Sequence, residues 1–261
     1  MKSSDISRRR FGAVAGSGLA SLAFSNACDA TMEWTAGSDG RLTARPKTVS
    51  NPAAGGERPL GPDARRDAVL FVPSKASDSP MALLLLLHGA GGTGGRVLNR
   101  VRDAAEAAGI VVLAPDSRND TWDAIRAGFG PDVAFIDRAL ARVFETVPVD
   151  RARVAIGGFS DGASYALSLG LINGDLFQHV VAFSPGFLVS GARVGQPRIF
   201  ISHGTADQIL PIDQTSRLIA PGLKGRGYDV TFREFDGGHD LPAAIAKEGF
   251  TWLGGSPSSR R

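Results

Sequence analysis

The chain has only one cysteine, Cys28, in 261 residues, so an intramolecular disulfide is excluded. It also has little net charge, because charged residues make up 21% of it and the formal net charge is +3. Residues 1–27 hold most of the imbalance, with one acid, Asp5, against Lys2, Arg8, Arg9 and Arg10. Without them Lys+Arg falls from 29 to 25 and Asp+Glu from 26 to 25, which leaves a net charge of 0. A neutral body has no broad positive field for phosphates, so we expect no nucleic-acid partner.

The chain also lacks an apolar run long enough for a permanent membrane span. The run 11–24 is short and rich in Gly and Ser, follows Arg8-Arg9-Arg10, and leads into Ser25-Asn26-Ala27. A basic head, an apolar middle and small exit residues make up a secretory signal, and two arginines followed by one residue and Phe11 resemble the twin-arginine signal. We therefore interpret residues 1–27 as an export signal, of twin-arginine or general secretory type, and expect a periplasmic or secreted protein.

Cys28 lies directly after the candidate cleavage site, a position that would allow acylation and a lipid anchor. Ser25 stands where a lipobox usually has Leu, so an incidental cysteine is the alternative. Residues 28–66 are rich in Gly, Pro and Ala and are predicted to form a tether with a short strand near 42–44. Residues 254–261 are predicted to be a frayed tail.

Between Asp67 and Leu253 the pattern predicts a single domain in which strands and helices alternate. Met81 to Leu87 is a continuous apolar run, which is typical of a strand covered on both faces. Further strands are predicted at 68–72, 110–114, 153–157, 180–183, 199–202 and 229–235, and helices at 132–146, 161–172, 214–219 (cut short by Pro221) and from about 241. This alternation predicts an α/β fold with a mostly parallel sheet and helices on both faces.

One pentapeptide, Gly158-Phe159-Ser160-Asp161-Gly162, matches G-x-S-x-G between a predicted strand and a predicted helix. The motif requires this strand–turn–helix setting, in which the serine takes a strained conformation and the flanking glycines remove side chains that would collide. Ser160 is therefore the candidate nucleophile. The alternative is a helix N-cap serine.

A serine hydroxyl needs a base, and of the four histidines only His239 follows both Ser160 and Asp207 along the chain. His239 lies on the loop after the last predicted strand, and Asp207 lies on a loop after an earlier strand. The steps are 207 − 160 = 47 and 239 − 207 = 32 residues, each about one helix-and-strand unit. The order Ser, acid, His is the one found with this turn. We therefore predict a triad of Ser160, Asp207 and His239. His203, at the end of a predicted strand, and His179, at the start of another, are assigned no chemistry.

Backbone N–H groups are predicted to hold the oxyanion. One donor is Asp161, directly after the nucleophile, and the other is Ala90, with Gly91 as second choice, in the loop His88-Gly89-Ala90-Gly91-Gly92. Trp122, on the loop after the strand at 110–114, is predicted either to wall the acyl pocket or to pack beneath that loop. Two phenylalanines, Phe159 and Phe187, are expected in the core.

The same glycine-rich loop also matches a dinucleotide-binding pattern. Gly89, Gly91 and Gly94 satisfy G-x-G-x-x-G after a strand, and Asp116 ends the next strand. Against this reading stand His88 at the strand end and the lack of a Tyr-x-x-x-Lys set. A nucleotide-binding oxidoreductase is kept as the alternative.

Four motifs together resemble the phospholipase/carboxylesterase group of α/β-hydrolases over about Asp67 to Leu253: His88 to Gly92, Gly158 to Gly162, His203-Gly204-Thr205-Ala206-Asp207 and Gly237-Gly238-His239. The resemblance implies the α/β-hydrolase fold and hydrolysis of a small-molecule ester through an acyl-enzyme, with no metal and no organic cofactor. Serine peptidase and thioesterase activity of the same fold remain open, as do substrate size and oligomeric state. Asp161, where many relatives have Gln, is a departure.

Overall fold

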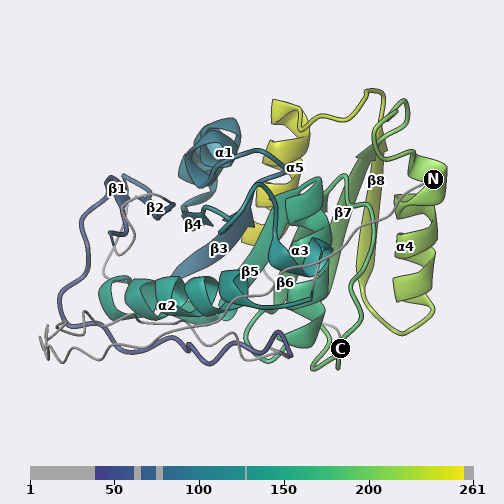
Figure 1. Ribbon diagram of the computed structural model, residues 1–261. Coiled ribbons are helices and arrows are strands. Elements are labelled where there is room, and N and C mark those ends of the chain that lie inside the picture. The colour runs from purple at the N-terminus through teal and green to yellow at the C-terminus, as the bar shows by residue number, and fades with distance from the viewer. Residues whose placement is uncertain (1–38, 62–65, 75–78, 127, 256–261) are drawn as a thin grey trace, which may run out of the picture. The chain divides into compact units, whose positions relative to one another are not determined.

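Strand β3 (Met81–Leu87) lies in the middle of an eight-stranded sheet (Figure 1). The computed structural model describes residues 39–61, 66–74, 79–126 and 128–255; the predicted export signal and Cys28 lie outside them. The strand order is β1-β2-β4-β3-β5-β6-β7-β8. The other strands are β1 (Gly56–Pro59), β2 (Ala68–Val72), β4 (Ile110–Pro115), β5 (Val149–Phe159), β6 (His179–Phe183), β7 (Arg198–Gly204) and β8 (Val230–Phe235).

Six of these strands are parallel, and only the β1–β2 and β2–β4 pairings are antiparallel. The apolar run of β3 has a role on each face of the sheet, because side chains alternate along a strand. Leu83, Leu85 and Leu87 belong to the buried cluster on one face, while Ala82, Leu84 and Leu86 belong to the cluster on the other. The expected mostly parallel sheet is confirmed.

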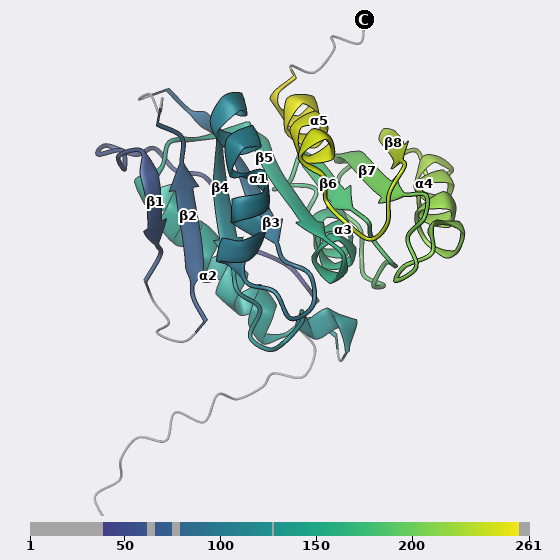
Figure 2. The same cartoon turned by 90° about the horizontal axis from the view of Figure 1, so that it is seen from above.

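Helices cover both faces, as Figures 1 and 2 show. On one face lie α1 (Gly94–Ala108) and α5 (Ala243–Gly254). On the other lie α2 (Pro131–Thr146), α3 (Asp161–Ile172) and α4 (Ser216–Lys224), with short 3-10 turns at Asp123–Ile125 and Ile212–Gln214. No helix in the described part of the chain is long and apolar enough to cross a membrane.

The predicted stop at Pro221 is wrong, because α4 continues through that residue to Lys224. Proline removes one helical N–H and normally costs stability inside a helix. Pro221 is exposed, while Ala220 and Leu223 are buried against the core. Packing of that buried face therefore outweighs the missing hydrogen bond.

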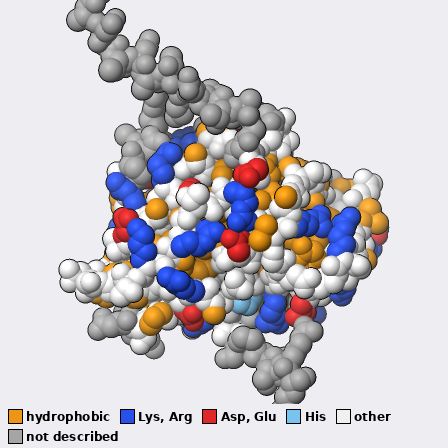
Figure 3. Space-filling view, turned by 90° about the horizontal axis from the view of Figure 1, so that it is seen from below, with side chains coloured by type: hydrophobic (Ala, Val, Ile, Leu, Met, Phe, Trp, Pro, Cys, Tyr) orange, Lys and Arg blue, Asp and Glu red, His pale blue; other side chains and the backbone are white. Residues whose placement is uncertain are grey.

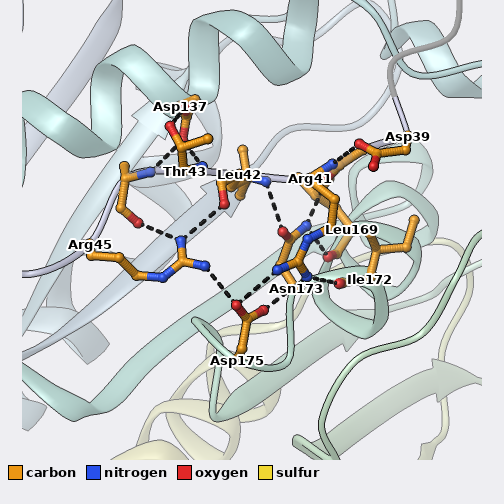
Figure 4. Close-up of polar contacts among 12 residues, drawn as sticks. Asp39, Arg41, Leu42, Thr43, Arg45, Asp137, Leu169, Ile172, Asn173 and Asp175 are labelled. Atoms are coloured by element: carbon orange, nitrogen blue, oxygen red, sulfur yellow. Dashed lines mark hydrogen bonds and ion pairs between the residues drawn. The ribbon is translucent and has the colours of Figure 1, made fainter.

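The segment 39–47, called here the N-terminal strap, is extended but pairs with no strand, so the strand expected near 42–44 is not formed. Its backbone is bonded to side chains instead (Figure 4): Leu42 N–H donates to Asn173 Oδ1 at 2.8 Å, and the N–H groups of Thr43 and Ala44 donate to Asp137 Oδ1, each at 2.8 Å. The Leu42 side chain is 2% exposed and joins the core cluster of α2 and α3. The side chains of Asn173 and Asp137 thus accept the backbone N–H groups that a neighbouring strand would otherwise bind.

Charges of both signs are interspersed on the face seen from below, with apolar groups between them (Figure 3). Ion pairs join separate segments of the chain, including Arg45 with Asp175 and Lys47 with Glu145. This agrees with the near-neutral charge of the sequence outside residues 1–27.

Candidate active site

Ser160 lies on the sharp turn between β5 and α3, at the carboxyl end of the sheet. Its backbone has φ 58° and ψ −123°, in the left-handed region that non-glycine residues avoid. The Ser160 N–H donates to Phe183 O at 2.9 Å, and the Ser160 carbonyl accepts the N–H of Ala163 at 2.9 Å. These bonds from β6 and α3 hold the strained turn.

The glycines on either side of the turn are required by close packing. A Cβ on Gly158 would lie 2.4 Å from the carbonyl group of Gly162. A Cβ on Gly162 would lie 2.3 Å from Leu87 O at the end of β3. Both distances are far inside van der Waals contact, as the motif led us to expect. The turn therefore brings the Ser160 backbone close to the end of β3.

The three predicted triad residues form one continuous hydrogen-bonded chain. His239 Nε2 lies 2.8 Å from Ser160 Oγ, and His239 Nδ1 lies 2.7 Å from Asp207 Oδ2. Asp207 follows β7, and His239 lies between β8 and α5. Parallel strands bring the ends of β5, β7 and β8 to one edge of the sheet, so residues far apart in sequence meet there.

Asp207 is 5% exposed and is held as a carboxylate. Burial alone would raise its pKa, but the hydrogen bonds from Leu210 N–H, His239 and Ile209 N–H outweigh burial and keep the pKa below its ordinary value. The two backbone N–H groups reach Oδ1 at 2.9 Å (Ile209) and 2.8 Å (Leu210). The carboxylate is thus fixed in place and negatively charged at neutral pH.

The sequence interpretation missed one histidine of this site. His203 is the second-last residue of β7, and its Nε2 lies 3.1 Å from Asp207 Oδ2. The signal is visible in the sequence, because His203 lies only four residues before Asp207. Among the described residues, no group of three or more His, Cys, Asp and Glu is arranged to hold a metal ion.

The loop after β3 lies beside Ser160, since a Cβ on Gly89 would be 3.2 Å from Ser160 Cβ. Ala90 N–H and Asp161 N–H have no acceptor within the described part of the chain, so both are available to a ligand. Gly91 N–H instead donates to Asp120 O at 2.7 Å. Of the two candidates in this loop, Gly91 is therefore occupied by the fold and Ala90 is the free donor.

Trp122 is fully buried, which matches packing beneath its loop and not a wall of the substrate pocket. Its indole N–H donates to His88 O at 2.8 Å, and its ring lies 4.9 Å from that of His88 and 5.3 Å from that of Tyr165. His88 in turn accepts Ser117 N–H on Nε2 at 3.0 Å and faces Gly89 O with Nδ1. Trp122 thus supports the loop that carries Ala90 from below.

The loop between β4 and α2 is tied down by two carboxylates, the buried Asp132 and the half-buried Asp123. Asp132 accepts the N–H of Arg118 at 2.6 Å and of Asp123 at 2.7 Å. Asp123 accepts the N–H of Gly130 at 2.9 Å and the hydroxyl of Tyr165 at 2.9 Å. Burial, together with the negative charge of Asp123, raises the pKa of Asp132 to about 6. The loop is thereby fixed to the start of α2 and, through Tyr165, to α3.

Side chains at the carboxyl end of the sheet differ in exposure. Phe159 is half-buried, with its ring 5.0 Å from that of His239. The expectation that Phe187 packs in the core is wrong, because it is 38% exposed on the loop after β6. Ile209, on the loop that begins at Asp207, is 70% exposed. Thr121 donates its hydroxyl to Asp161 Oδ2 at 2.7 Å, which anchors the residue after the nucleophile.

The start of α1, where a dinucleotide pyrophosphate would bind, is already capped by side chains. Asp116 Oδ1 accepts Gly94 N–H at 2.7 Å, and Thr93 Oγ1 accepts Arg96 N–H at 3.3 Å. The carboxylate of Asp116 therefore lies at the helix N-terminus, where it would repel a phosphate. Nothing in the fold favours the oxidoreductase alternative.

Comparison with known proteins agrees with this fold. A family model described as Phospholipase/Carboxylesterase matches residues 133–245. Feruloyl esterase C of Emericella nidulans is 28% identical over 210 residues, which cover 67% of this chain and 76% of that protein. Acyl-protein thioesterase 1 of Gibberella zeae is 31% identical over 97 residues, covering 33% of this chain and 41% of that protein.

Among solved structures, a fluorophosphonate-binding serine hydrolase of Staphylococcus aureus, FphF, superposes with a TM-score of 0.63 at 17% identity, covering 78% of this chain and 100% of that one. Esterase PE8 gives a TM-score of 0.57 at 21% identity, covering 70% of this chain and 95% of that one. At these identities the likeness shows the fold. The chain thus has the α/β-hydrolase fold, and its residues 133–245 are similar to the Phospholipase/Carboxylesterase family.

Proposed function

We propose that this protein hydrolyses carboxylic esters through an acyl-enzyme formed on Ser160. One observation carries the proposal: the unbroken chain of hydrogen bonds from Ser160 Oγ through His239 to Asp207, at 2.8 and 2.7 Å. Such a chain lets the imidazole take the serine proton as the hydroxyl attacks, while the carboxylate stabilises the imidazolium.

The reaction has two steps. Ser160 Oγ attacks the ester carbonyl, and its proton passes to His239 Nε2. The negative oxygen of the tetrahedral intermediate accepts hydrogen bonds from Ala90 N–H and Asp161 N–H. His239 then protonates the leaving alcohol. In the second step His239 activates a water molecule, which releases the acid and frees Ser160.

Two features support an apolar acyl or aryl group on the substrate. Phe187 and Ile209 expose apolar surface on the two loops that follow β6 and β7, at the edge of the sheet where the triad residues lie. In addition, three of the matched relatives are named feruloyl esterase C or probable feruloyl esterase C. Esters of aromatic acids are therefore the first natural-type substrates to test.

The test is hydrolysis of p-nitrophenyl acetate, butyrate and octanoate, and of methyl ferulate, by the wild type and by Ser160→Ala. The variant should lose kcat by about 10⁴-fold or more, because the nucleophile is gone. Ser190→Ala, an exposed serine on the loop after β6, is the matched control and should keep the wild-type rate. A fluorophosphonate probe should label the wild type at Ser160. Peptide mass spectrometry locates the labelled residue.

Folded wild type that hydrolyses none of these esters and takes up no probe would end the proposal. Turnover of acyl thioesters with no ester turnover would favour the thioesterase alternative instead. That alternative has a relative of its own, the acyl-protein thioesterase.

A further inference from the structure

His203 is a buried polar side chain to which the proposed reaction assigns no step. It is fully buried at the end of β7, four residues before Asp207. Its Nε2 lies 2.8 Å from Leu210 O and 3.1 Å from Asp207 Oδ2, and its Nδ1 lies 2.7 Å from Ser216 Oγ. Every polar atom of the ring therefore has a partner.

The partners fix which nitrogen carries the proton. Leu210 O is a carbonyl and Asp207 is a carboxylate, so both can only accept. Nε2 must therefore carry the hydrogen and share it between these two oxygens. Burial lowers the pKa of His203, so at neutral pH the ring is neutral and Nδ1 has a free lone pair. That lone pair accepts the hydroxyl of Ser216, which is also fully buried.

With His203 included, the Asp207 carboxylate is surrounded by donors. Oδ1 accepts two backbone N–H groups, from Ile209 and Leu210, while Oδ2 is bonded to His239 and has His203 Nε2 3.1 Å away. An ionised carboxylate offers about four lone-pair sites, and four donor groups face it here. The acid of the triad has no freedom left to rotate away from His239.

We propose that His203 is a positioning residue that locks Asp207 Oδ2 against His239, with Ser216 fixing the ring so that its N–H faces the carboxylate. The proposal rests on the proposed function, since it assigns His203 a part in the same triad. A neutral donor suits this task because it orients the carboxylate without cancelling its charge. A cation at this place would compete with the imidazolium of His239 for the same oxygen.

The first experiment compares His203→Phe with His203→Gln at pH 8 in the full-length protein. Phenylalanine fills the ring space but donates nothing, whereas the glutamine amide can return an N–H to Asp207. His203→Phe should lower kcat about 10- to 100-fold with KM within about two-fold, because small misplacements of catalytic groups have effects of this size. His203→Gln should recover most of that loss. His179→Phe, which replaces a buried histidine at the far end of neighbouring β6, should leave kcat unchanged.

The second experiment is a double-mutant cycle with Asp207→Asn. If His203 acts through the carboxylate, His203→Phe should lower kcat by less than about three-fold once Asp207 is neutral. If His203 were merely structural, His203→Phe would lower kcat by the same factor in the wild type and in Asp207→Asn. Should His203→Phe fail to fold, Ser216→Ala serves as the milder variant. It removes the hydroxyl that holds the ring at Nδ1, so the ring can turn and its N–H can move away from Asp207, and we expect a drop in kcat of about three- to ten-fold.

Wild-type kcat in His203→Phe, or in Ser216→Ala where His203→Phe does not fold, would overturn the inference. An equal loss of kcat in His203→Phe and His203→Gln would also overturn it. So would a double mutant in which the kcat losses of His203→Phe and Asp207→Asn multiply fully. Failure of the proposed function is seen separately, as activity that survives Ser160→Ala.

Discussion

The backbone conformation that exposes the Ser160 hydroxyl requires glycine, which has no side chain, on both sides of the turn. The turn passes so close to β3 that neither Gly158 nor Gly162 has room for a methyl group. The strain at φ 58° is thus held by packing on both sides and by the hydrogen bond from Ser160 N–H to Phe183 O.

Gly162→Ala should therefore reduce both stability and activity. Its Cβ would lie 2.3 Å from Leu87 O, a backbone atom that cannot rotate away. We expect a loss of about 1–3 kcal/mol in the free energy of unfolding, as for other overpacked sites, and a lower kcat because the turn must shift. Urea unfolding and p-nitrophenyl butyrate hydrolysis measure the two effects.

Gly95→Ala is the matched control, because a Cβ there meets nothing within 4 Å and Gly95 lies in α1. It should keep the wild-type rate and be as stable or slightly more stable, since alanine is the better helix former. Equal behaviour of the two variants would contradict the packing argument.

Single residues also show what the sequence could predict about the site. Ser160, Asp207 and His239 were identified because their order and spacing follow from the motif and the strand ends. The roles of His203, Gly91 and Trp122 depend on where loops fold back: Ser216 meets His203 from thirteen residues away, and Asp120 takes the Gly91 N–H. No local pattern encodes those contacts.

At the scale of elements, the N-terminal strap shows how an irregular segment becomes part of the core. Leu42 fills a site between α2 and α3, and the backbone on both sides is bonded to Asn173 and Asp137 (Figure 4). Arg41 and Arg45 both form partly exposed ion pairs with Asp175. The apolar contact and the buried hydrogen bonds, more than the partly exposed ion pairs, should hold the strap.

Leu42→Ala should accordingly lower the free energy of unfolding by about 2–5 kcal/mol, as expected for a buried leucine. Arg45→Ala, which removes an ion pair whose side chains are 39% and 34% exposed, should cost less than about 1 kcal/mol. Urea unfolding measures both. A larger loss in Arg45→Ala than in Leu42→Ala would show that the ion pairs dominate.

The elements that the sequence predicted with the same bounds are those with an unambiguous pattern. The strand at 81–87 is one continuous apolar run, and the helix at 161–172 begins directly after the motif serine. β1 was missed because Gly-Glu-Arg-Pro has no strand pattern and is defined only by pairing with β2. β5 begins at Val149, before the expected 153, because polar residues lead in through an irregular register with β3.

At the scale of the whole molecule, several titratable groups are buried with opposite effects on stability. Burial lowers the pKa of His88 and His203, and burial with the charges of Arg198 and Arg153 lowers that of His179 to about 4. Unfolding returns the pKa of each to about 6.5, so the contribution of each is full above that pH and is lost as the pH falls below it, down to about pH 4 for His179. Asp132, with its pKa raised to about 6, contributes fully below about pH 4, and its contribution is lost as the pH rises to about 6.

The free energy of unfolding should therefore fall between pH 6.5 and pH 4, because three histidines oppose one strongly shifted aspartate. His179→Phe should reduce the loss of unfolding free energy between pH 6.5 and pH 4 by about 3 kcal/mol at most. This limit follows from a pKa of about 4 in the folded protein against about 6.5 in the unfolded chain. Asp132→Asn should steepen it, since the opposing contribution is removed. Urea unfolding at half-unit steps of pH measures the slopes, and unchanged slopes in both variants would contradict the assignment.

The edge strand β1 has a consequence for how molecules meet one another. It is four residues long, mostly exposed, carries Glu57 and Arg58, and ends at Pro59, which has no amide hydrogen. A second copy that tried to extend the sheet there would find few free N–H groups and would bury charges. The sheet is thus closed to growth between molecules on that side, which favours a protein that stays dispersed when it is concentrated.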